Sequence, residues 1–200
     1  YYKMGIDRGD TTSMNNYAYM LESGEGTSVN YEEAFKYFKM AINKGDLTSA
    51  SNYANMLASG RGVPVNYEEA IKYYKIAADD GVTFGMNGYA FMRERGRGGP
   101  ANFEEAIKYY KMAIEKGCSS AMYNYANMLS KRGGEGAPVN YEEAAKYYKM
   151  AIEKGESNAM YYYACMLVKG EGVPINIEEA HKYFIMSIEN GNLNATYNYA

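Results

Sequence analysis

The chain has 200 residues, of which 47% are hydrophobic and 22% are charged, and its formal net charge is −3. No apolar stretch reaches the ~18 residues that a membrane-spanning helix needs, so we expect no insertion into a membrane. The lysines are spread evenly along an acidic chain, which argues against nucleic acid as a ligand.

A segment of the form Asn-Tyr-Glu-Glu-Ala, with Phe or Ile replacing Tyr in two copies, recurs at spacings of 36, 36, 38 and 36 residues. A Tyr-Ala pair recurs with the same period and the same two-residue insertion, which falls near residues 131–136. A period of this length indicates two short helices per unit. The segments begin at Asn30, Asn66, Asn102, Asn140 and Asn176.

The chain is expected to begin and end inside a unit. Its first four residues repeat the pattern of residues 73–76, and its last four repeat that of residues 123–126. We therefore expect residues 1–200 to be a single repeat array cut from a longer protein, with about five full units and a partial helix at each end. The loops between units are predicted near residues 24–30, 60–66, 96–102, 132–140 and 170–176.

The first helix of each unit is predicted from small residues that recur at two positions. In the second unit this helix covers residues 47–59, with Ser49 and Ala54 at the small positions and Leu57 on the same side. Small side chains let helices approach closely. A methionine recurs on the same helix, and we favour a core position for it over an apolar strip for partners. These residues are Met20, Met56, Met92, Met128 and Met166.

The second helix is predicted from its end signals. In the second unit it covers residues 66–81, where Asn66 accepts from the first-turn amides and Glu69 completes a capping box. Gly81 supplies a left-handed stop. One such hairpin leaves a flank of its apolar surface bare, so units must stack. We therefore predict an all-α fold, a right-handed α-solenoid of tandem helix-turn-helix repeats with a long concave face.

In these residues the chain resembles the Sel1-like repeat family, a relative of the tetratricopeptide repeats, over essentially its whole length. Tyr-Ala replaces the family's Leu-Gly, Leu57 stands at an aromatic position and Asn66 replaces an aspartate, and these changes compensate in volume. The matching residues of the second unit are Ser49, Tyr53-Ala54, Leu57, Gly60-Arg61-Gly62-Val63, Asn66, Ala70, Tyr73, Ala77-Ala78 and Gly81.

The resemblance implies an adaptor that binds proteins in signalling, in ubiquitin-ligase-linked protein quality control or in the regulation of other enzymes. Some cysteine-rich relatives bind penicillin-like molecules, and each of their units is closed by a disulfide. Here the only cysteines, Cys118 and Cys165, belong to different units and show neither a disulfide framework nor a metal-ligand spacing.

In related tetratricopeptide arrays the first helices line the binding groove, so three positions of these helices are expected to contact a partner. Asparagine both donates and accepts, so a ladder of asparagines can pair with an extended peptide backbone, and tyrosines add apolar area. The alternative is that the repetition only records duplication of the unit. No Lys or Arg stands at these positions, which argues against capture of a peptide carboxylate. The candidate partner-binding residues are Asn15, Asn16, Tyr19, Ser51, Asn52, Asn55, Asn87, Phe91, Tyr123, Asn124, Asn127 and Tyr161.

The third unit departs from the pattern. Arg93 replaces the leucine of the first helix, Arg95 and Arg97 follow it, and Gly85 and Gly88 are expected to weaken the same helix. Arginine pairs bidentately with anions, so these three arginines are candidate contacts for a phosphate or an acidic partner. The alternative, which we favour, is a decayed unit in which the Arg93 side chain reaches out to water.

His181 is the only histidine, and it occupies a position that is apolar in earlier units, so we expect a partly buried packing residue. No second histidine, serine or cysteine shares this position. We therefore expect no catalytic triad, no metal site and no cofactor.

We predict a non-enzymatic, monomeric scaffold that binds an extended peptide or a protein partner in the concave groove. Two alternatives stay open: a regulatory segment of a larger enzyme such as a protein kinase, and, against the cysteine pattern, a hydrolase of the cysteine-rich kind. A third alternative, RNA recognition by helical repeats, lacks the basic face that it needs. We favour the cytoplasm over association with the endoplasmic reticulum.

Overall fold

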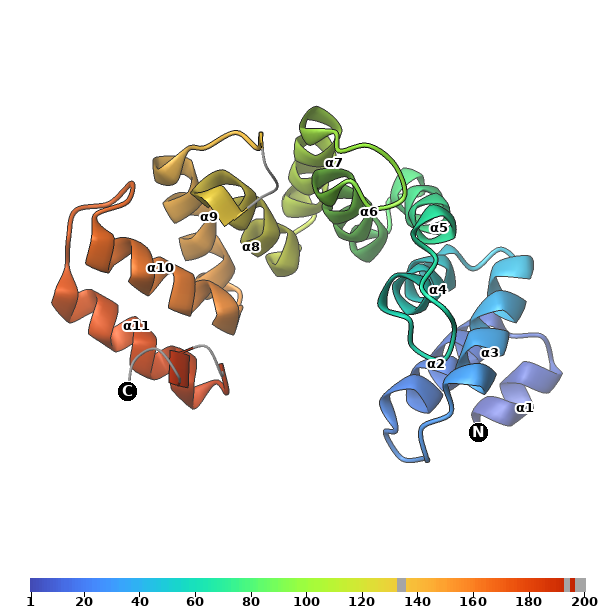
Figure 1. Cartoon of the computed structure of the whole chain (residues 1–200). Coiled ribbons are helices and arrows are strands. Elements are labelled where there is room, and N and C mark those ends of the chain that lie inside the picture. The colour runs from blue at the N-terminus through green and yellow to red at the C-terminus, as the bar shows by residue number, and fades with distance from the viewer. Residues whose placement is uncertain (133–135, 193–194, 197–200) are drawn as a thin grey trace. The chain divides into compact units, whose positions relative to one another are not determined.

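The computed structural model describes residues 1–132, 136–192 and 195–196 (Figure 1). Within these residues the chain forms α-helices, one short π-helical segment and no β-strand. No helix among them is long and apolar enough to cross a membrane. The helices are α1 (Tyr2–Asp7), α2 (Thr11–Ser23), α3 (Tyr31–Asn43), α4 (Leu47–Ser59), α5 (Tyr67–Asp79), α6 (Thr83–Arg95), α7 (Phe103–Glu115), α8 (Ser119–Asn127), η1 (Met128–Arg132, π-helical), α9 (Tyr141–Glu153), α10 (Ser157–Lys169) and α11 (Ile177–Glu189). This confirms the predicted all-helical repeat fold.

The chain divides into two compact units, which we call unit 1 (residues 1–102) and unit 2 (residues 103–200). In unit 1, helices α1 to α6 each pack on the next helix along the chain, and α4 also contacts α6. In unit 2, α7 to α11 pack in the same consecutive manner. The first helices of the repeats are therefore α2, α4 and α6 in unit 1, and α8 and α10 in unit 2.

The second helices begin at an asparagine cap, as predicted. The Oδ1 atom of Asn66 accepts from the Glu69 backbone N–H at 3.0 Å, and the Glu69 carboxylate accepts from the Asn66 Nδ2 atom at 3.2 Å. The backbone N–H of Asn66 donates instead to the Leu57 carbonyl oxygen at 2.9 Å. The capping box is thus closed through side chains, and the backbone bond ties each loop to its first helix.

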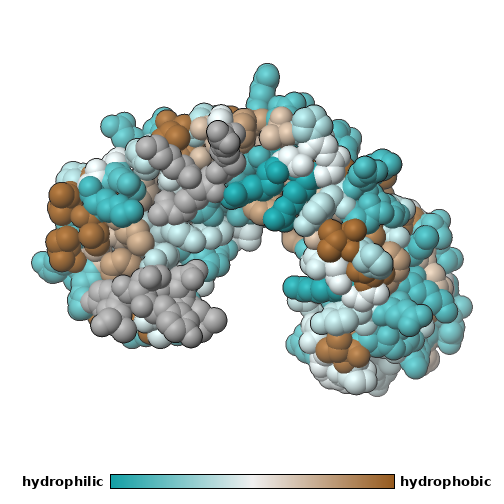
Figure 2. Space-filling model, viewed as in Figure 1, coloured by the Kyte–Doolittle hydropathy of each residue, from teal (hydrophilic) through white to brown (hydrophobic). Residues whose placement is uncertain are grey.

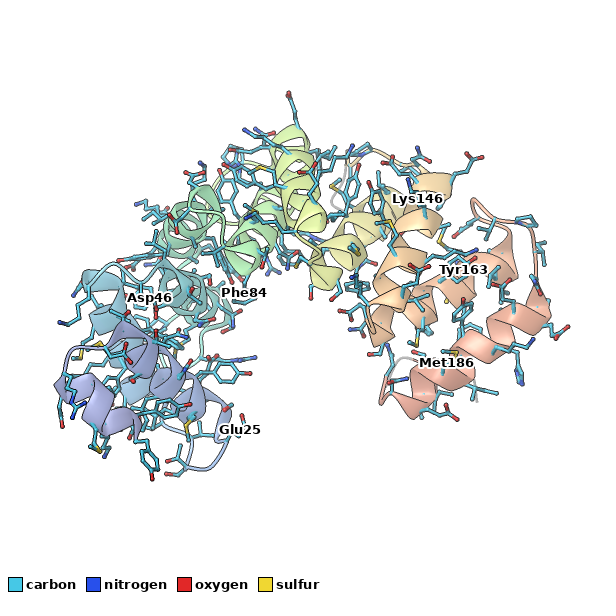
Figure 3. The ribbon with its side chains drawn as sticks, turned by 180° about the vertical axis from the view of Figure 1, so that it is seen from behind. Glu25, Asp46, Phe84, Lys146, Tyr163 and Met186 are labelled. Atoms are coloured by element: carbon cyan, nitrogen blue, oxygen red, sulfur yellow. The ribbon has the colours of Figure 1, made fainter. Side chains whose placement is uncertain are left out.

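The tyrosine of the Tyr-Ala pair contacts a ring of the following helix in several of the described repeats. Tyr163 in α10, which is labelled in Figure 3, is 1% exposed. Its ring centroid lies 5.2 Å from that of Tyr183 in α11. The Lys149 ammonium of α9 lies 5.1 Å from the Tyr163 ring centroid, at cation–π distance. Tyr53 and Tyr73 pair in the same way in unit 1, with centroids 4.8 Å apart. The tyrosine, which is larger than the leucine of the family pattern, therefore fills the contact between the two helices of a repeat.

The recurrent methionines belong to the core, as we favoured. Met56, Met92, Met128 and Met166 are at most 2% exposed, whereas Met20 is half-buried. A methionine adapts its shape to irregular gaps between helices. Exposed apolar residues occur instead as small separated patches within each unit, as the face in view in Figure 2 shows.

The two glycines of α6 let this helix approach α5 closely. A Cβ atom at Gly85 would lie 2.6 Å from the Ala77 Cβ atom, and one at Gly88 would lie 2.3 Å from the Tyr74 ring. Helix α6 nevertheless continues without a break to Arg95. Besides their expected low helix propensity, the two glycines therefore have a packing role, because the space for any larger side chain is already occupied.

The two-residue insertion changes the end of the first helix in the fourth repeat. The backbone continues past α8 as the π-helical segment η1, which ends one position beyond the residue equivalent to the last residue of α4. A π-turn accommodates an extra residue within a helix. Residues 133–135 of the loop predicted at 132–140 lie outside the described residues.

His181 is exposed on α11, whereas Phe35 and Ile71 at the equivalent positions are half-buried. The prediction of a partly buried packing residue was therefore wrong. Burial at this position requires neighbouring helices, and among the described helices α11 packs mainly on α10.

Candidate partner-binding face

We call the surface formed by the predicted contact positions of α2, α4 and α6, and separately of α8 and α10, the first-helix face of each unit. Most predicted residues lie at least partly exposed on it, and Tyr19 is 53% exposed. Two residues do not. Ser51 is fully buried and its hydroxyl donates to the Thr48 carbonyl oxygen at 2.8 Å, and Asn87 is only 8% exposed. We therefore correct these two assignments, because the close contact of neighbouring helices buries them.

Asparagines of neighbouring repeats bind one another on the face of unit 1. The Oδ1 atom of Asn15 in α2 accepts from the Asn52 Nδ2 atom and from the Ser49 hydroxyl of α4, each at 3.0 Å. The Asn15 Nδ2 atom lies 3.5 Å from the Asn16 Oδ1 atom. This network fixes the orientation of the amides before any partner arrives.

Two other predicted asparagines bind tyrosines of the second helix of their own repeat. The Asn127 Oδ1 atom accepts from the Tyr148 hydroxyl at 2.7 Å, and the Asn55 Oδ1 atom accepts from the Tyr74 hydroxyl at 3.5 Å. The Ser130 hydroxyl lies 3.0 Å from that of Tyr148. The Asn127 side chain also forms a hydrogen bond with Tyr123, whereas the bond to Tyr74 uses only the amide oxygen of Asn55 and leaves its Nδ2 group as a donor.

In unit 2 the face carries a group of aromatic rings. The Tyr123 ring centroid lies 5.9 Å from that of Tyr162, which stacks 6.1 Å from Tyr148. Tyr161 lies 5.1 Å from Tyr162 and 5.8 Å from Phe184. Burial raises the pKa of Tyr123 to about 12, so its hydroxyl stays protonated to a higher pH than that of an exposed tyrosine.

Tyr162 was not among the contact residues predicted from the sequence. It occupies the same repeat position as the predicted Asn16, Asn52 and Asn124. Its place in the period was therefore the signal that could have identified it, although its residue type differs.

Three arginines of the third repeat lie in different surroundings. The Nη1 atom of Arg93 donates to the Pro100 carbonyl oxygen at 3.2 Å, so it binds its own loop. The Nε atom of Arg95 lies 3.1 Å from the Glu94 carboxylate. The Arg97 guanidinium lies over two aromatic rings, 5.3 Å from the Tyr67 centroid and 5.5 Å from the Phe91 centroid. Of the three, Arg97 lies beside a hollow of the first-helix face.

Two hollows lie on the first-helix face of unit 1. One has a volume of about 560 Å³ and the other about 190 Å³. The first is lined by Tyr2, Asn16, Tyr19, Met20, Glu25 and Gly26. The second is lined by Asn55, Ala58, Ser59, Tyr74, Gly88, Phe91, Met92 and Arg97.

Among the described residues, no group of three or more His, Cys, Asp or Glu side chains could hold a metal ion. Cys118 and Cys165 are both free thiols and half-buried. The polar groups of the face are mainly amides and phenols, which suit hydrogen bonding to a partner.

The model of the Sel1 repeat matches residues 11–46, 48–82, 83–118, 119–156 and 157–192. These ranges follow the helix pairs described above and cover most of the chain. Among curated proteins, none matches this chain significantly.

Several solved structures are similar to this chain. A Sel1 repeat protein from Oxalobacter formigenes is 26% identical with a TM-score of 0.79, and the match covers 92% of this chain and 73% of that one. A protective antigen of uropathogenic Escherichia coli with an SLR fold is 24% identical with a TM-score of 0.77, and the match covers 98% of this chain but only 42% of the antigen. An immunity protein from Pseudomonas aeruginosa shares the fold at 17% identity, with a TM-score of 0.62 and coverage of 94% and 71%.

Proposed function

The chain belongs to the Sel1 repeat family, and from this premise we propose that it is a scaffold whose first-helix face binds an extended segment of a protein partner. Repeats of this kind generally mediate protein interactions, because stacked helix pairs present a long continuous surface. The proposal covers each unit by itself.

The observation that carries the proposal is the recurrence of the hollows. Each of five lining residues of the first hollow has a counterpart in the second, two repeats further along the chain. The pairs are Tyr2 with Tyr74, Asn16 with Gly88, Tyr19 with Phe91, Met20 with Met92, and Glu25 with Arg97. Hollows at equivalent positions of two repeats suit two separate side chains of an extended segment, and the amides beside them suit its backbone.

The charged residue differs between the two hollows. Glu25 lines the first and Arg97 lines the second, and both are exposed. Opposite charges at equivalent positions would select the direction and the sequence of a bound segment, because a like charge opposite either residue is unfavourable.

The proposal is tested by selecting from a displayed library of unstructured peptides with the full 200-residue chain. The variant Asn16→Ala/Tyr19→Ala/Phe91→Ala removes polar and aromatic contacts from the first-helix face of unit 1. We expect the selected peptides to lose at least about ten-fold in affinity for this variant, since each contact removed contributes on the order of 1 kcal/mol.

A matched control carries Lys36→Ala/Lys72→Ala/Ile76→Ala, which removes exposed side chains from the second helices α3 and α5. It should bind the peptides as the unaltered chain does, and both variants should keep their far-ultraviolet circular dichroism. If the selected peptides lost affinity for the control variant but not for the first-helix variant, binding would lie on the second helices and the proposal would be refuted.

A further inference from the structure

Two loop arginines occupy the same position in successive repeats and have different surroundings. Arg61 and Arg97 each stand between two glycines, directly after a first helix. Arg61 forms an ion pair with the preceding repeat, whereas the Arg97 side chain forms no ion pair or hydrogen bond among the described residues.

The Arg61 pair shows what this position of the repeat can hold. The Nη1 atom of Arg61 donates to the Glu22 carboxylate of α2 at 3.0 Å. The Glu22 side chain is only 8% exposed, whereas that of Arg61 is 53% exposed. The nearly buried carboxylate of Glu22 therefore accepts a charge-assisted hydrogen bond from the guanidinium of a loop arginine.

One repeat later, the residue equivalent to Glu22 has no carboxylate. Ala58 of α4 occupies the position equivalent to Glu22, and both Ala58 and Arg97 line the hollow of about 190 Å³. Gly88 stands where the preceding junction has Asn52, so the hollow is also free of that amide. The space that the Glu22 side chain fills at one junction is thus open at the next.

The remaining groups around this hollow suit an anion. The Arg97 guanidinium is positioned by the Tyr67 and Phe91 rings, which leaves its N–H groups as donors. The Asn55 Oδ1 atom accepts from the Tyr74 hydroxyl, so the Asn55 Nδ2 group is the second side-chain donor. No acidic side chain lines the hollow.

We propose that this hollow binds the carboxylate of a glutamate or aspartate side chain within the extended segment of a partner, with Arg97 as its ion-pair partner and Asn55 as a second donor. The partner's carboxylate would take the place that Glu22 occupies beside Arg61. The proposal rests on the proposed function and adds the chemistry of one partner residue. It uses Arg97, which the sequence already offered as a candidate contact for an acidic partner, and it concerns a side-chain carboxylate of the partner.

The test is an NMR titration of the full chain with two capped peptides, Ac-Gly-Ser-Asn-Glu-Asn-Ser-Gly-amide and the same peptide with Gln in place of Glu. The side-chain signals of Arg97 Nε and Asn55 Nδ2 should shift saturably with the Glu peptide. Affinity should fall about ten-fold or more with the Gln peptide or in Arg97→Gln, which is the size of one hydrogen bond to a charged group.

Two variants use the neighbouring junction as an internal control. Ala58→Glu should pair with Arg97 as Glu22 pairs with Arg61, and it should abolish the response to the Glu peptide. Glu22→Ala should release Arg61 and produce a second, saturable set of shifts at Arg61 Nε that the unaltered chain lacks. Both substitutions are at helix positions already occupied by the other residue in a neighbouring repeat, so both variants should fold.

The remaining outcomes are distinguishable. Equal binding of the Glu and Gln peptides would overturn the carboxylate site while leaving peptide binding on the first-helix face intact. No shift at Arg97 or Asn55 at millimolar peptide would also overturn it, whatever library peptides bind elsewhere on the face. Tighter binding of a third peptide whose only carboxylate is its free C-terminus would overturn the assignment to a side chain.

Discussion

The asparagines of the first-helix face have a structural role in addition to the recognition role that we propose for them. Asn127 accepts from the Tyr148 hydroxyl, which is fully buried, and Asn52 donates to Asn15 of the preceding repeat. Their amide orientations are therefore fixed by the fold. This lowers the entropic cost of binding, because the amides are already positioned when a partner arrives.

Because of its bond to Tyr148, Asn127 is expected to contribute to the free energy of unfolding. In Asn127→Ala, the Tyr148 hydroxyl keeps Ser130 as a partner but loses its 2.7 Å bond to the amide, so we expect the free energy of unfolding to fall by about 1 kcal/mol. Asn55→Ala should cost less, because its bond to Tyr74 is 3.5 Å long. Urea unfolding followed by circular dichroism measures both, and an equal loss for the two variants would contradict this account.

Buried tyrosines make stability depend on pH at the alkaline end. Burial, aided by the nearby Glu69 carboxylate, raises the pKa of Tyr53 to about 12, from an ordinary value of about 10. Because the folded state holds this proton more tightly, its contribution to stability is fully present below pH 10. The contribution is lost as the pH rises from about 10 toward 12.

We therefore expect the midpoint of urea unfolding to fall steeply over that interval, and Tyr53→Phe to reduce the slope. The ultraviolet absorbance of tyrosinate, recorded alongside circular dichroism, identifies the titration. A slope that is unchanged in Tyr53→Phe would exclude this residue as its source.

The repeat positions of Asn55 and Asn127 could be predicted from periodicity, but their tyrosine partners could not. Tyr148 lies 21 residues beyond Asn127, and the contact depends on how the two helices of one repeat cross. Ser51 was wrongly placed for the same reason, since a period gives the direction of a side chain but not how closely the next helix approaches.

At the scale of helices, close approach determines which residues are tolerated. Helix α6 carries glycines where other first helices carry Ala, Ser, Asn or Tyr, and it lies against the α5 backbone near Ala77 and Ala78. Sequence propensity alone would treat Gly85 as a defect. The structure shows that the spacing of α5 and α6 depends on it.

We expect Gly85→Ala to destabilise the chain although alanine favours helix by about 1 kcal/mol. The added Cβ atom would lie 2.6 Å from that of Ala77 and 3.0 Å from backbone atoms, so α6 must move. Ser120→Ala, at an exposed helical position, is the control and should leave the melting temperature unchanged or slightly raised. A higher melting temperature in Gly85→Ala would show that the helices separate without cost.

Helix ends were the most predictable elements. Asn66, Glu69 and Gly81 act as predicted at the ends of α5, and Gly81 has a φ of +87°. Local chemistry fixes such ends, because the capping groups lie within a few residues of the amides that they satisfy. The π-helical segment η1 was not predictable from the pattern, since an insertion of two residues can be taken up in a loop or in a helix.

At the scale of the whole molecule, the helix pairs of tandem repeats bury their apolar flanks by stacking, so the fold class could be predicted from the period alone. The charge pattern of the first-helix face could not be predicted from the period. Arg61 and Arg97 are indistinguishable by position, and only their three-dimensional neighbours, Glu22 and Ala58, separate a paired arginine from one that faces a hollow.

The central claim is that partners bind along the first helices. Its most direct test places a photo-reactive benzoyl-phenylalanine at Tyr19 in α2 or, as a matched control, at Ile76 in α5; these residues are 53% and 47% exposed. Irradiation with a peptide selected on the unaltered chain should cross-link efficiently from position 19 and only at background level from position 76. Efficient cross-linking from position 76 with none from position 19 would contradict the account.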